Sequence, residues 1–555
     1  MQVNIEKVPF SRFGSYFAVS PGRNGGYALR DVHGGDDAPS ELFTLSFRKQ
    51  GREVEVKVDC TETLLRFVSL EDERDQVELI LPTERHLMVR ARGMSLILRA
   101  SKVKYDTFHE LGENTYEYHI YPKELKLLFT RLKGDLSVDA PWNVIGNDHV
   151  HLELSEGELL VESYQTVPGE DPALTFEEGK EKVRLEYEAV RNAHGEHEPR
   201  YRASLNLASY ITWSSVVHPE GNLTYPAMFM SKLWMYNIWS WDNCFNALGL
   251  AKDHPHLAYE QLEIFMDHQD ESGAYPDFIN DKFKSYNCVK PPIFPYFYLK
   301  YMEKNPFFRE RENLEKAYDS MARNLAYYEK YRTYEGRIPH YRHGNDSGWD
   351  NASLFHAGMP AEAPDLAAHL IRSYDAMKDM AGILGMEADV GIYREKADAL
   401  QRILLELYHD EEGFFGRVGR EGKKNPIRTS LILCLPLIIG YRLDKPVVEK
   451  LVKNLEAFEA DYGLATESLG SERYKANGYW LGPIWAPVSF LFIDSLYELD
   501  YRDFADRLRR KYLELTLVGG MAENFDPYTG EGLVDTSFTW TSSVFLELLK
   551  RKAGV

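Results

Sequence analysis

The sequence predicts a mostly α-helical protein in which an N-terminal β-sandwich precedes an (α/α) barrel of paired helices. Residues 1–172 alternate apolar and polar side chains with the period of a half-buried strand. Residues 173–204 form a charged segment with helical spacing, and residues 205–555 keep a helical period over most of their length. A chain of 555 residues is long enough for one small and one large domain of these kinds.

The strands of the N-terminal domain are expected to pair as antiparallel hairpins. Apolar and polar side chains alternate in residues 54–58, 116–120 and 149–154. Turn sequences that contain Gly stand at 111–114 and 155–158. Short strands separated by such turns predict the sandwich.

Helical spacing begins in the segment 173–204, which we interpret as a helical linker. Its central part, 175–192, is rich in Glu, Lys and Arg, with apolar residues at roughly helical intervals. The barrel domain follows from residue 205. Its helices are predicted from apolar positions such as Leu314, Ala317, Tyr318, Met321, Leu325 and Tyr328.

Successive helices over roughly 350 residues, joined by loops with Gly, Pro and aromatic residues, suit a barrel of helical hairpins. A solenoid of helical repeats is the structural alternative. Because the sequence has no fixed repeat period, the barrel is preferred.

Composition limits the partners of the protein. Hydrophobic residues make up 44% and aromatic residues 13% of the chain, enough for a large core and an aromatic ligand cleft. A formal charge of -21 argues against nucleic acid or an anionic membrane as the main partner, because phosphate binding needs clustered Lys and Arg. A neutral carbohydrate fits better, although an acidic surface also serves solubility alone.

Cysteine and histidine usage predicts no cofactor. The chain has 4 Cys residues, far apart and without a CxxC pair, and its 17 His residues show no HExxH spacing. No loop has the spacing of an EF-hand, so metal ligands are not assigned and a structural calcium ion is left open. The N-terminus lacks a basic region followed by an apolar stretch, so a cytoplasmic location is expected. The oligomeric state is not predicted.

The first segment with chemical character spans residues 236–243. It holds Trp239 and Trp241 next to Asp242. Indole faces stack on pyranose rings, and a carboxylate can hold sugar hydroxyls. The alternative is a helix start in which Asp242 is the cap and the tryptophans belong to the core.

Two loop sequences follow. Residues 268–276 include Gln269 before a Gly-Ala-Tyr-Pro sequence, and a Lys-Pro-Pro sequence begins at Lys290. Gly and Pro can position polar side chains for ligand contact, and they also suit plain turns between helices.

Residues 343–353 concentrate two carboxyl groups and a tryptophan in a stretch too polar for a core. Asp350 follows Trp349, whose apolar ring can desolvate the carboxyl and raise its pKa, as a general acid requires. Asn351 supplies a further hydrogen-bonding group. Asp346, which begins the same loop, is the nearest competitor for the role of acid, and an Asp/Asn/Ser turn is the structural alternative.

The last segments lie near the C-terminus. Residues 478–487 contain Trp480 and Trp485, and Glu523 stands in a loop that is followed by Trp540. An inverting glycoside hydrolase uses two carboxyl groups about 6.5–9.5 Å apart, one that protonates the leaving oxygen and one that activates water. Asp350 and Glu523 are the predicted pair.

Taken in order, these segments resemble the catalytic domain of glycoside hydrolase family 63, which includes processing α-glucosidases and mannosylglycerate or glucosylglycerate hydrolases; the family 37 trehalases are similar. The resemblance extends from about residue 225 to residue 549. It rests on the ordered series WD, Q with GAYP, KPP, DSGWDNAS, YWLGPIW, ENFDPYTGE and FTW. It implies an (α/α) barrel of six hairpins, inversion at the anomeric carbon and a pocket for a terminal sugar.

The resemblance implies that Asp350 is the general acid and Glu523 the general base. Substrate-binding residues are expected at Trp239, Trp241, Asp242, Gln269, Trp349, Asn351, Trp480, Trp485 and Trp540.

The sequence departs from the family pattern at two positions. The family commonly has Arg where this chain has Leu481, which makes acidic leaving groups less expected. Ala352 stands where Ser is usual.

The predicted function is an exo-acting inverting hydrolase that releases a terminal sugar, glucose, from a small α-glucoside or oligosaccharide. A trehalase-like α,α-glucosidase is the enzymatic alternative. An inactive carbohydrate-binding protein is the alternative from another class. Glu467 is a further candidate for substrate contact, and a surface turn suits it equally.

Overall fold

The computed structural model describes residues 1–101 and 104–551. These residues form two compact units, and the boundaries differ from the predicted ones because the helix after residue 175 and two later segments belong to the first unit. The first unit comprises Met1–Glu196, Ser209–Asn237 and Asn280–Phe283, and the second His197–Ala208, Ile238–Ile279 and the chain from Lys284 onwards.

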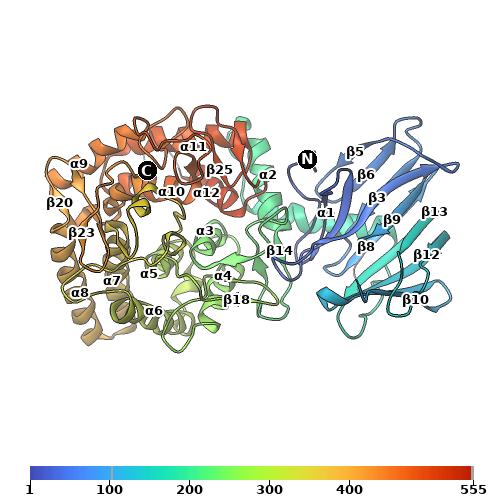
Figure 1. Cartoon of the computed structure of the whole chain (residues 1–555), viewed down its shortest axis with the longest axis horizontal. Coiled ribbons are helices and arrows are strands. Elements are labelled where there is room, and N and C mark those ends of the chain that lie inside the picture. The colour runs from blue at the N-terminus through green and yellow to red at the C-terminus, as the bar shows by residue number, and fades with distance from the viewer. Residues whose placement is uncertain (102–103, 552–555) are drawn as a thin grey trace. The chain divides into compact units, whose positions relative to one another are not determined.

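The first unit is built on one branched antiparallel sheet of thirteen strands (Figure 1). Its main path runs β1-β2-β3-β9-β13-β8-β7-β6-β5, with β12, β11 and β10 continuing from β13, and β4 beside β3. The strands are β1 Phe17–Pro21, β2 Tyr27–Asp31, β3 Glu41–Lys49, β4 Arg52–Glu53, β5 Val56–Cys60, β6 Leu65–Ser69, β7 Gln76–Ile80, β8 His86–Arg92, β9 Ser95–Ala100, β10 Thr107–Gly112, β11 Thr115–Ile120, β12 Leu125–Asp139 and β13 His151–Tyr164.

The strands of the predicted sandwich all belong to one sheet, and the long strand β13 connects them. Its first part pairs with β9 and its second part with β8, while β12 runs along both. The pairing of β12 and β13 shifts register between Arg131 and Asp135. A Cβ at Gly134 would lie 2.0 Å from the carbonyl oxygen of Glu156, so only Gly allows the strands to approach there.

The strand predictions are confirmed in part. Residues 116–120 lie within β11, and the turn predicted at 111–114 joins β10 to β11. The turn predicted at 155–158 is wrong, because these residues lie inside β13. Gly157 marks the irregular pairing of a continuous strand, a feature that a Gly in a strand pattern also produces.

The predicted helix at 175–192 is α1, Phe176–Ala193, and it belongs to the first unit. Thr175 and Glu178 form a reciprocal capping box at its start, which satisfies two backbone donors. Phe176 packs in a buried cluster with Ile80 and Met88 of the sheet. The apolar stripe therefore docks the helix on the sheet, while its charged face stays in solvent.

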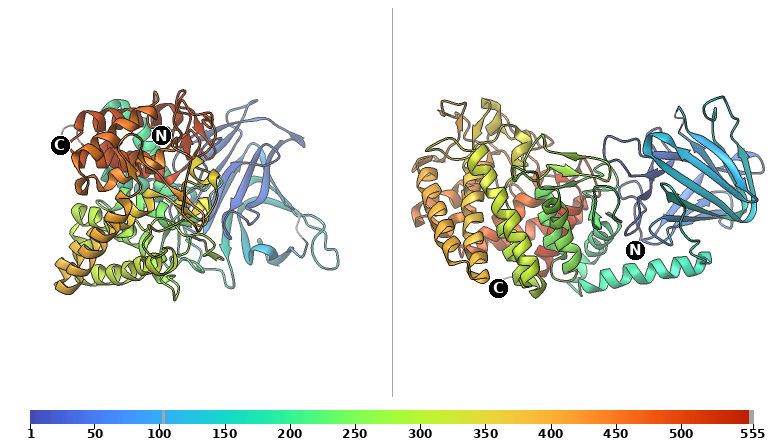
Figure 2. Two further views of the ribbon diagram at one scale, coloured as in Figure 1. Left: turned by 60° about the vertical axis from the view of Figure 1, so that its left-hand side comes forward. Right: turned by 90° about the horizontal axis from the view of Figure 1, so that it is seen from below.

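The second unit is helical, and its helices stand side by side in Figure 2. Each of several consecutive pairs packs together, such as α3 with α4, α7 with α8 and α10 with α11. The helices are α3 Ser240–Leu250, α4 Pro255–Asp267, α5 Phe294–Lys304, α6 Arg311–Tyr331, α7 Pro364–Leu384, α8 Glu387–Leu405, α9 Lys445–Asn454, α10 Ala486–Glu498, α11 Arg502–Gly519 and α12 Thr539–Lys550; α2, Arg202–Ser214, starts in this unit and ends in the first.

The last helix closes the ring by returning to the first. Helix α12 packs against α3, and a Cβ at Gly249 would lie 2.9 Å from the Cβ of Ser543. The Ser543 hydroxyl donates to the Oδ1 of Asn246 over 3.3 Å. A solenoid leaves its ends apart, so this contact confirms the predicted barrel.

Short elements occupy the loops of the barrel. Residues 431–439, the most apolar segment of the sequence, lie in the 3₁₀ stretch η6, Leu431–Arg442, which is buried from Leu431 to Gly440. Within residues 1–101 and 104–551, no helix is both long and apolar enough to cross a bilayer. The loops also contain the short strands β16 Ile238–Trp239, β24 Ile484–Trp485 and β25 Asn524–Phe525, and the 3₁₀ turns η4 Gly344–Ser347 and η5 Ser353–Ala357.

Candidate active site

Two short strands join the segment of Trp485 to the segment of Glu523. Strand β24 pairs with β25, so Trp485 lies opposite Asn524, the residue after Glu523. The indole N–H of Trp540 donates to the carbonyl of Glu523 over 3.2 Å, and the Glu523 N–H donates to the carbonyl of Asp535 over 2.7 Å. The backbone of Glu523 is therefore fixed from several sides.

Five tryptophans of the predicted site form one continuous row. Trp480 and Trp485 are stacked, with ring centroids 3.9 Å apart and planes within 7°. Trp349 contacts Trp480, Trp485 contacts Trp540, and Trp540 contacts Trp241. All five are buried. Only Trp480 and Trp485 meet face to face; the other contacts are tilted or edge-to-face, so the five rings form one packed aromatic cluster.

The loop that carries Asp350 is held by its neighbour Asp346. The Asp346 carboxylate is buried and accepts from Arg332, from the N–H of Val289 and from two further backbone N–H groups of its own loop. With its oxygens occupied in this way, Asp346 has a structural role. Asp350 is half-exposed on the same loop. The geometry thus favours Asp350 over its competitor as the acid.

Two further contacts place the Asp350 loop against the tryptophan row. Gly348 has a φ of +72°, and a Cβ there would lie 2.6 Å from the Trp241 ring. The Asn351 side chain donates to the carbonyl of Gly478 over 3.1 Å and accepts from the N–H of Trp480 over 2.8 Å. Asn351 therefore ties its loop to the Trp480 loop.

We expect Gly348→Ala to destabilise the protein by about 2–4 kcal/mol, since it adds both left-handed strain and a clash with Trp241. Urea unfolding measures the loss. Gly382→Ala is the matched control, because Gly382 lies in α7 with no atom within 4 Å of its added Cβ. That control should gain about 0.5–1 kcal/mol from helix propensity. Equal stability of the two variants would contradict the tight contact with Trp241.

The Glu523 carboxyl is buried; one of its oxygens accepts a hydrogen bond, and the other has no partner within the described residues. The Tyr479 hydroxyl donates to Oε1 over 2.9 Å, and Oε2 has no hydrogen-bond partner within the described residues. Burial, with the charges of Asp535 and Asp350, raises the pKa of Glu523 to about 8, although the Tyr479 hydrogen bond lowers it. The influence of Asp350 on this pKa means that the two carboxyls share one electrostatic environment.

Two further titratable groups, Asp242 and Lys290, belong to the same electrostatic environment. Burial raises the pKa of Asp242 to about 7, opposed by Lys290 and reinforced by Asp277 and Asp350. The Lys290 ammonium lies 3.3 Å from Asp277 and donates to the carbonyl of Asn345 over 2.6 Å. Burial lowers the pKa of Lys290, but the charges of Asp277, Asp350 and Asp242 outweigh burial and raise it. One buried cation thus stands among three carboxyl groups.

The comparisons with known proteins agree with this site. A family model described as the mannosylglycerate hydrolase MGH1-like glycoside hydrolase domain matches residues 235–541, which include every residue of the predicted site. The chain belongs to this glycoside hydrolase family. The resemblance to glycoside hydrolase family 63 is confirmed, whereas the relation to trehalases stays a prediction.

Curated relatives of this MGH1-like protein match over limited lengths. A mannosylglycerate hydrolase of Rubrobacter radiotolerans is 37% identical over 13% of this chain and 16% of its own length. The mannosylglycerate hydrolase MGH1 of Selaginella moellendorffii is 26% identical over 36% of this chain and 42% of its own. The chain thus spans less than half the length of these relatives.

Solved structures support the fold of the MGH1-like chain. A mannosylglycerate hydrolase of Thermus thermophilus, in complex with glucose, matches with a TM-score of 0.54 and 18% identity over 63% of this chain and 99% of its own. A bacterial glucoamylase complexed with acarbose matches with a TM-score of 0.65 and 12% identity over 98% of this chain and 94% of its own.

Other predicted site residues of this MGH1-like chain have structural partners. The Gln269 amide donates to the carbonyls of Gly273 and Ser320 and accepts from the Ser320 hydroxyl, so it holds its loop against α6. To bind a sugar as predicted, the Gln269 amide would have to replace these hydrogen bonds by bonds to the sugar. Trp239 is half-buried and packs on Phe278. Sugar binding by Gln269 and Trp239 stays a prediction.

The surroundings of Glu467 and Asp242 test two alternatives, a surface turn at Glu467 and a helix cap at Asp242. Glu467 is fully buried and accepts from the hydroxyls of Ser353 and Ser471 over 2.6 Å each, so it is neither a surface turn nor an open substrate contact. Asp242 lies in the first turn of α3, and Trp239 is the N-cap. The cap interpretation of Asp242 is therefore wrong.

Three residues near the predicted pair were not singled out from the sequence. Tyr479 holds Glu523, Asp277 pairs with Lys290, and Asp535 lies close to Glu523. Tyr479 stands inside the recognised YWLGPIW segment, where its φ of +64° is unusual for a Tyr. Asp277 follows GAYP directly, so position in a motif was the available signal.

A candidate metal site lies elsewhere. Within the described part of the chain, Asp139, His149 and His151 offer ligand atoms within 4.8 Å of one another. They belong to the first unit, whereas Asp350 and Glu523 belong to the second. The expected absence of a catalytic cofactor stays a prediction.

Proposed function

We propose that the protein is an inverting glycoside hydrolase that removes a terminal sugar from a small α-glycoside. In this proposal Asp350 protonates the glycosidic oxygen, and Glu523 removes a proton from the water that attacks the anomeric carbon. The observation that carries the proposal is the link between the two carboxyl loops: Asn351, next to Asp350, accepts from the N–H of Trp480, and the adjacent Tyr479 donates to the buried Glu523. Membership of the MGH1-like family supports it.

The different exposure of the two carboxyls supports their different roles. Asp350 is half-exposed, so its carboxyl can reach a glycosidic oxygen from the solvent side. Glu523 is 2% exposed, and its Oε2 has no partner within residues 1–101 and 104–551. That oxygen is the acceptor that a water molecule on the inner side of the sugar needs. Asp242, beside Lys290, is a suitable acceptor for the sugar hydroxyls.

The substrate is proposed to be an α-glucoside or a related α-glycoside with a small aglycone. The printed names of relatives extend the test panel to mannosylglycerate and glucosylglycerate. Leu481 follows Trp480 and is 8% exposed, so this position offers no cation to a glycerate carboxylate. A neutral aglycone is therefore favoured over an acidic one.

Proton NMR of the released sugar tests the function directly. The panel comprises kojibiose, nigerose, trehalose, an α-mannoside, mannosylglycerate and glucosylglycerate, and the anomeric signal is followed before mutarotation. Early appearance of the β-anomer from an α-glycoside supports hydrolysis with inversion. Release of the α-anomer would overturn the mechanism, and preferential cleavage of trehalose would favour the trehalase-like alternative. Binding without release from any substrate would favour the inactive carbohydrate-binding protein.

Tyr479 is proposed to position Glu523 and to keep its carboxylate form accessible. Because the Tyr479 hydrogen bond lowers the Glu523 pKa, Tyr479→Phe should raise that pKa above its starting value of about 8. The ascending limb of kcat/KM against pH, which follows ionisation of the base in the free enzyme, should move to higher pH. At neutral pH, kcat/KM should fall roughly tenfold.

The pH profile separates positioning from a merely structural role. If Tyr479→Phe only loosened the loop, kcat/KM would fall at every pH without movement of the limb. Tyr474→Phe is the control, because Tyr474 lies in the same region with a hydroxyl that has no partner within the described residues. That variant should keep the original profile.

A further inference from the structure

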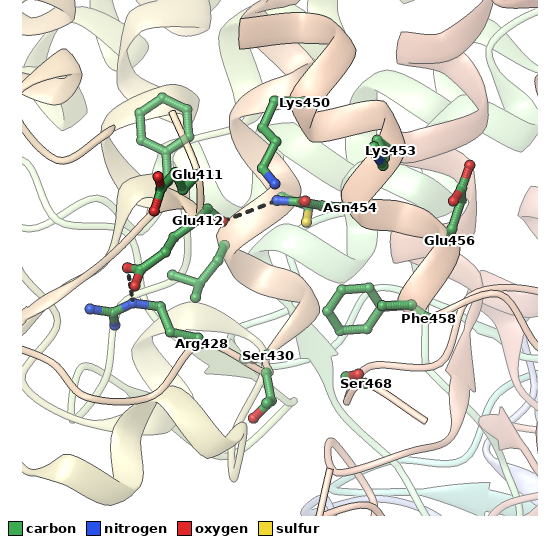
Figure 3. Close-up of a pocket in the computed structure, with 15 residues that line it drawn as sticks. Glu411, Glu412, Arg428, Ser430, Lys450, Lys453, Asn454, Glu456, Phe458 and Ser468 are labelled. Atoms are coloured by element: carbon green, nitrogen blue, oxygen red, sulfur yellow. Dashed lines mark hydrogen bonds and ion pairs between the residues drawn. The ribbon is translucent and has the colours of Figure 1, made fainter. Parts of the chain in front are cut away.

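A cavity opens in the barrel unit, between η6, α9 and the loops around residues 411–414 and 468 (Figure 3). Its volume is about 370 Å³, within the range of roughly 300–1,000 Å³ that is typical of small-molecule sites. None of its lining residues belongs to the predicted catalytic site. It is therefore a separate place where a small ligand can bind.

The cavity contains a lysine without an acidic partner. Lys450 on α9 is half-buried and makes no hydrogen bond or ion pair within the described part of the chain. In Figure 3 its side chain extends toward Asn454, one helical turn further on. The nearby Cys434 does not neutralise the ammonium, because burial raises the pKa of that thiol to about 12. The Lys450 charge is thus left for a ligand.

Two hydroxyls in the wall also have no partner within residues 1–101 and 104–551. Ser430 is fully buried, and its Oγ is unpaired; the Oγ1 of Thr429 is buried and unpaired as well. Native proteins leave few buried polar atoms unsatisfied, since each one costs about 1–3 kcal/mol. A ligand with hydroxyl groups would supply the missing hydrogen bonds.

The remaining walls are aromatic or aliphatic inside, and charged side chains lie at the exposed edge, namely Lys453, Glu411 and Glu456. Phe458 and Phe414 are buried and line the cavity together with Leu433. Arg428 donates to Glu412 over 3.3 Å and to the carbonyl of Ile427 over 2.8 Å, so its charge is committed. Within the described residues, the inner lining therefore combines the half-buried ammonium of Lys450, hydroxyls without partners and apolar faces, with the second unpaired lysine, Lys453, at the exposed edge.

We propose that this cavity binds a small polyhydroxylated carboxylate of about the size of one sugar unit. The carboxylate would pair with Lys450, and the hydroxyls would bond to Ser430 and Thr429. The apolar face of the carbon chain would pack on Phe458. This inference does not depend on the proposed hydrolase activity, because none of these residues takes part in it.

Isothermal titration calorimetry with D-gluconate tests the proposal on the full-length protein. D-Glucitol is the neutral comparison, because it keeps the hydroxyls and lacks the carboxylate, and inorganic phosphate is an anion without the carbon chain. We expect gluconate to bind at least tenfold more tightly than either compound. Equal binding of glucitol, equal binding of phosphate, or no gluconate binding at millimolar concentration would overturn the proposal.

Variants assign the binding to this cavity. Lys450→Met keeps the aliphatic stem and removes the charge, so it should weaken gluconate binding at least tenfold. Lys445→Met, at the exposed start of the same helix, is the matched control and should leave binding unchanged. Glu523→Gln should also leave this binding event unchanged, which separates it from any binding at the catalytic site. Unchanged affinity in Lys450→Met would overturn the assignment.

Ser430→Ala provides an independent readout. Removal of a buried hydroxyl without a partner should leave the unfolding temperature unchanged or slightly higher, while gluconate binding weakens severalfold. A structural hydroxyl would behave in the opposite way, with lower stability and unchanged binding. That second result would mean that only water occupies this wall.

Discussion

Glu523→Gln is expected to remove most turnover and to make the protein more stable. The amide keeps the shape of the side chain but cannot accept a proton from water, so kcat should fall at least about 10²–10⁴-fold. Stability should rise because the wild-type site buries a carboxyl that ionises only with difficulty. Initial rates on the substrate found by NMR and thermal unfolding of both proteins measure the two effects.

The stability effect has a defined pH dependence. The pKa of Glu523 is raised from an ordinary value of 4.5 to about 8, so the folded protein holds a proton that the unfolded chain releases between these values. The free energy of unfolding contributed by this group is fully present below about pH 4.5 and is lost as the pH rises to about 8. Glutamine has no such loss.

The difference in unfolding temperature between Glu523→Gln and the wild type should therefore grow from pH 5 to pH 8. We expect about 2 °C or more at the upper end, where the wild-type carboxylate is ionised and buried. Glu531→Gln is the control, because Glu531 is exposed and lies in the loop that follows Glu523. Gln269→Glu is not suitable, because the Gln269 amide is hydrogen-bonded. A constant difference across this range would contradict the raised pKa.

Asp350→Asn is expected to reduce hydrolysis of ordinary α-glycosides by about 10²–10⁴-fold while leaving the fold intact. If Asp350 is the acid, the deficit should shrink when the leaving group needs no proton. α-D-Glucosyl fluoride meets this condition. We therefore expect Asp350→Asn to keep a much larger share of wild-type activity on the fluoride than on a disaccharide.

The same substrate distinguishes acid from base. Glu523→Gln should stay slow on the fluoride, because attack by water still lacks its proton acceptor. If Glu523→Gln were the variant rescued by fluoride, the two roles would have to be exchanged. A raised pKa suits an acid as well as a buried base, so this comparison decides the assignment.

Asp346→Asn is the matched control for the Asp350 loop. It removes the same charge four residues away, where the carboxylate accepts from Arg332 and three backbone N–H groups. We expect loss of stability, by roughly 3–5 kcal/mol, because Arg332 would remain buried without its counter-charge. Rescue of this variant by a fluoride substrate would contradict the structural role of Asp346.

The architecture was largely predictable because periodicity reports which side of an element is buried. The strands at 116–120 and the helix at 175–192 follow directly from it. The turn expected at 155–158 failed because Gly157 also serves an irregular strand pairing, and local sequence does not distinguish these two uses. Closure of the ring depends on contact between α3 and α12, which lie far apart in the sequence, as in the bond between Asn246 and Ser543.

The candidate site was predictable to the extent that its residues lie within recognisable motifs. Asp350, Glu523 and the tryptophans were found in this way. The partners that set their properties were not, because Tyr479 with Glu523 and Lys290 with Asp277 are pairs that form only in the folded chain. Burial likewise separated Glu467 and Asp346, which the sequence kept as competitors, from the half-exposed Asp350.

The stacked pair of Trp480 and Trp485 gives the protein an intrinsic optical reporter. Two indoles 3.9 Å apart and within 7° of parallel couple their electronic transitions, so their near-ultraviolet circular dichroism differs from that of isolated tryptophans. Trp480 is also bonded to Asn351, the neighbour of Asp350. Any ligand that moves the Asp350 loop would change this signal, so occupancy of the catalytic site becomes visible without a label, even in variants that do not turn over.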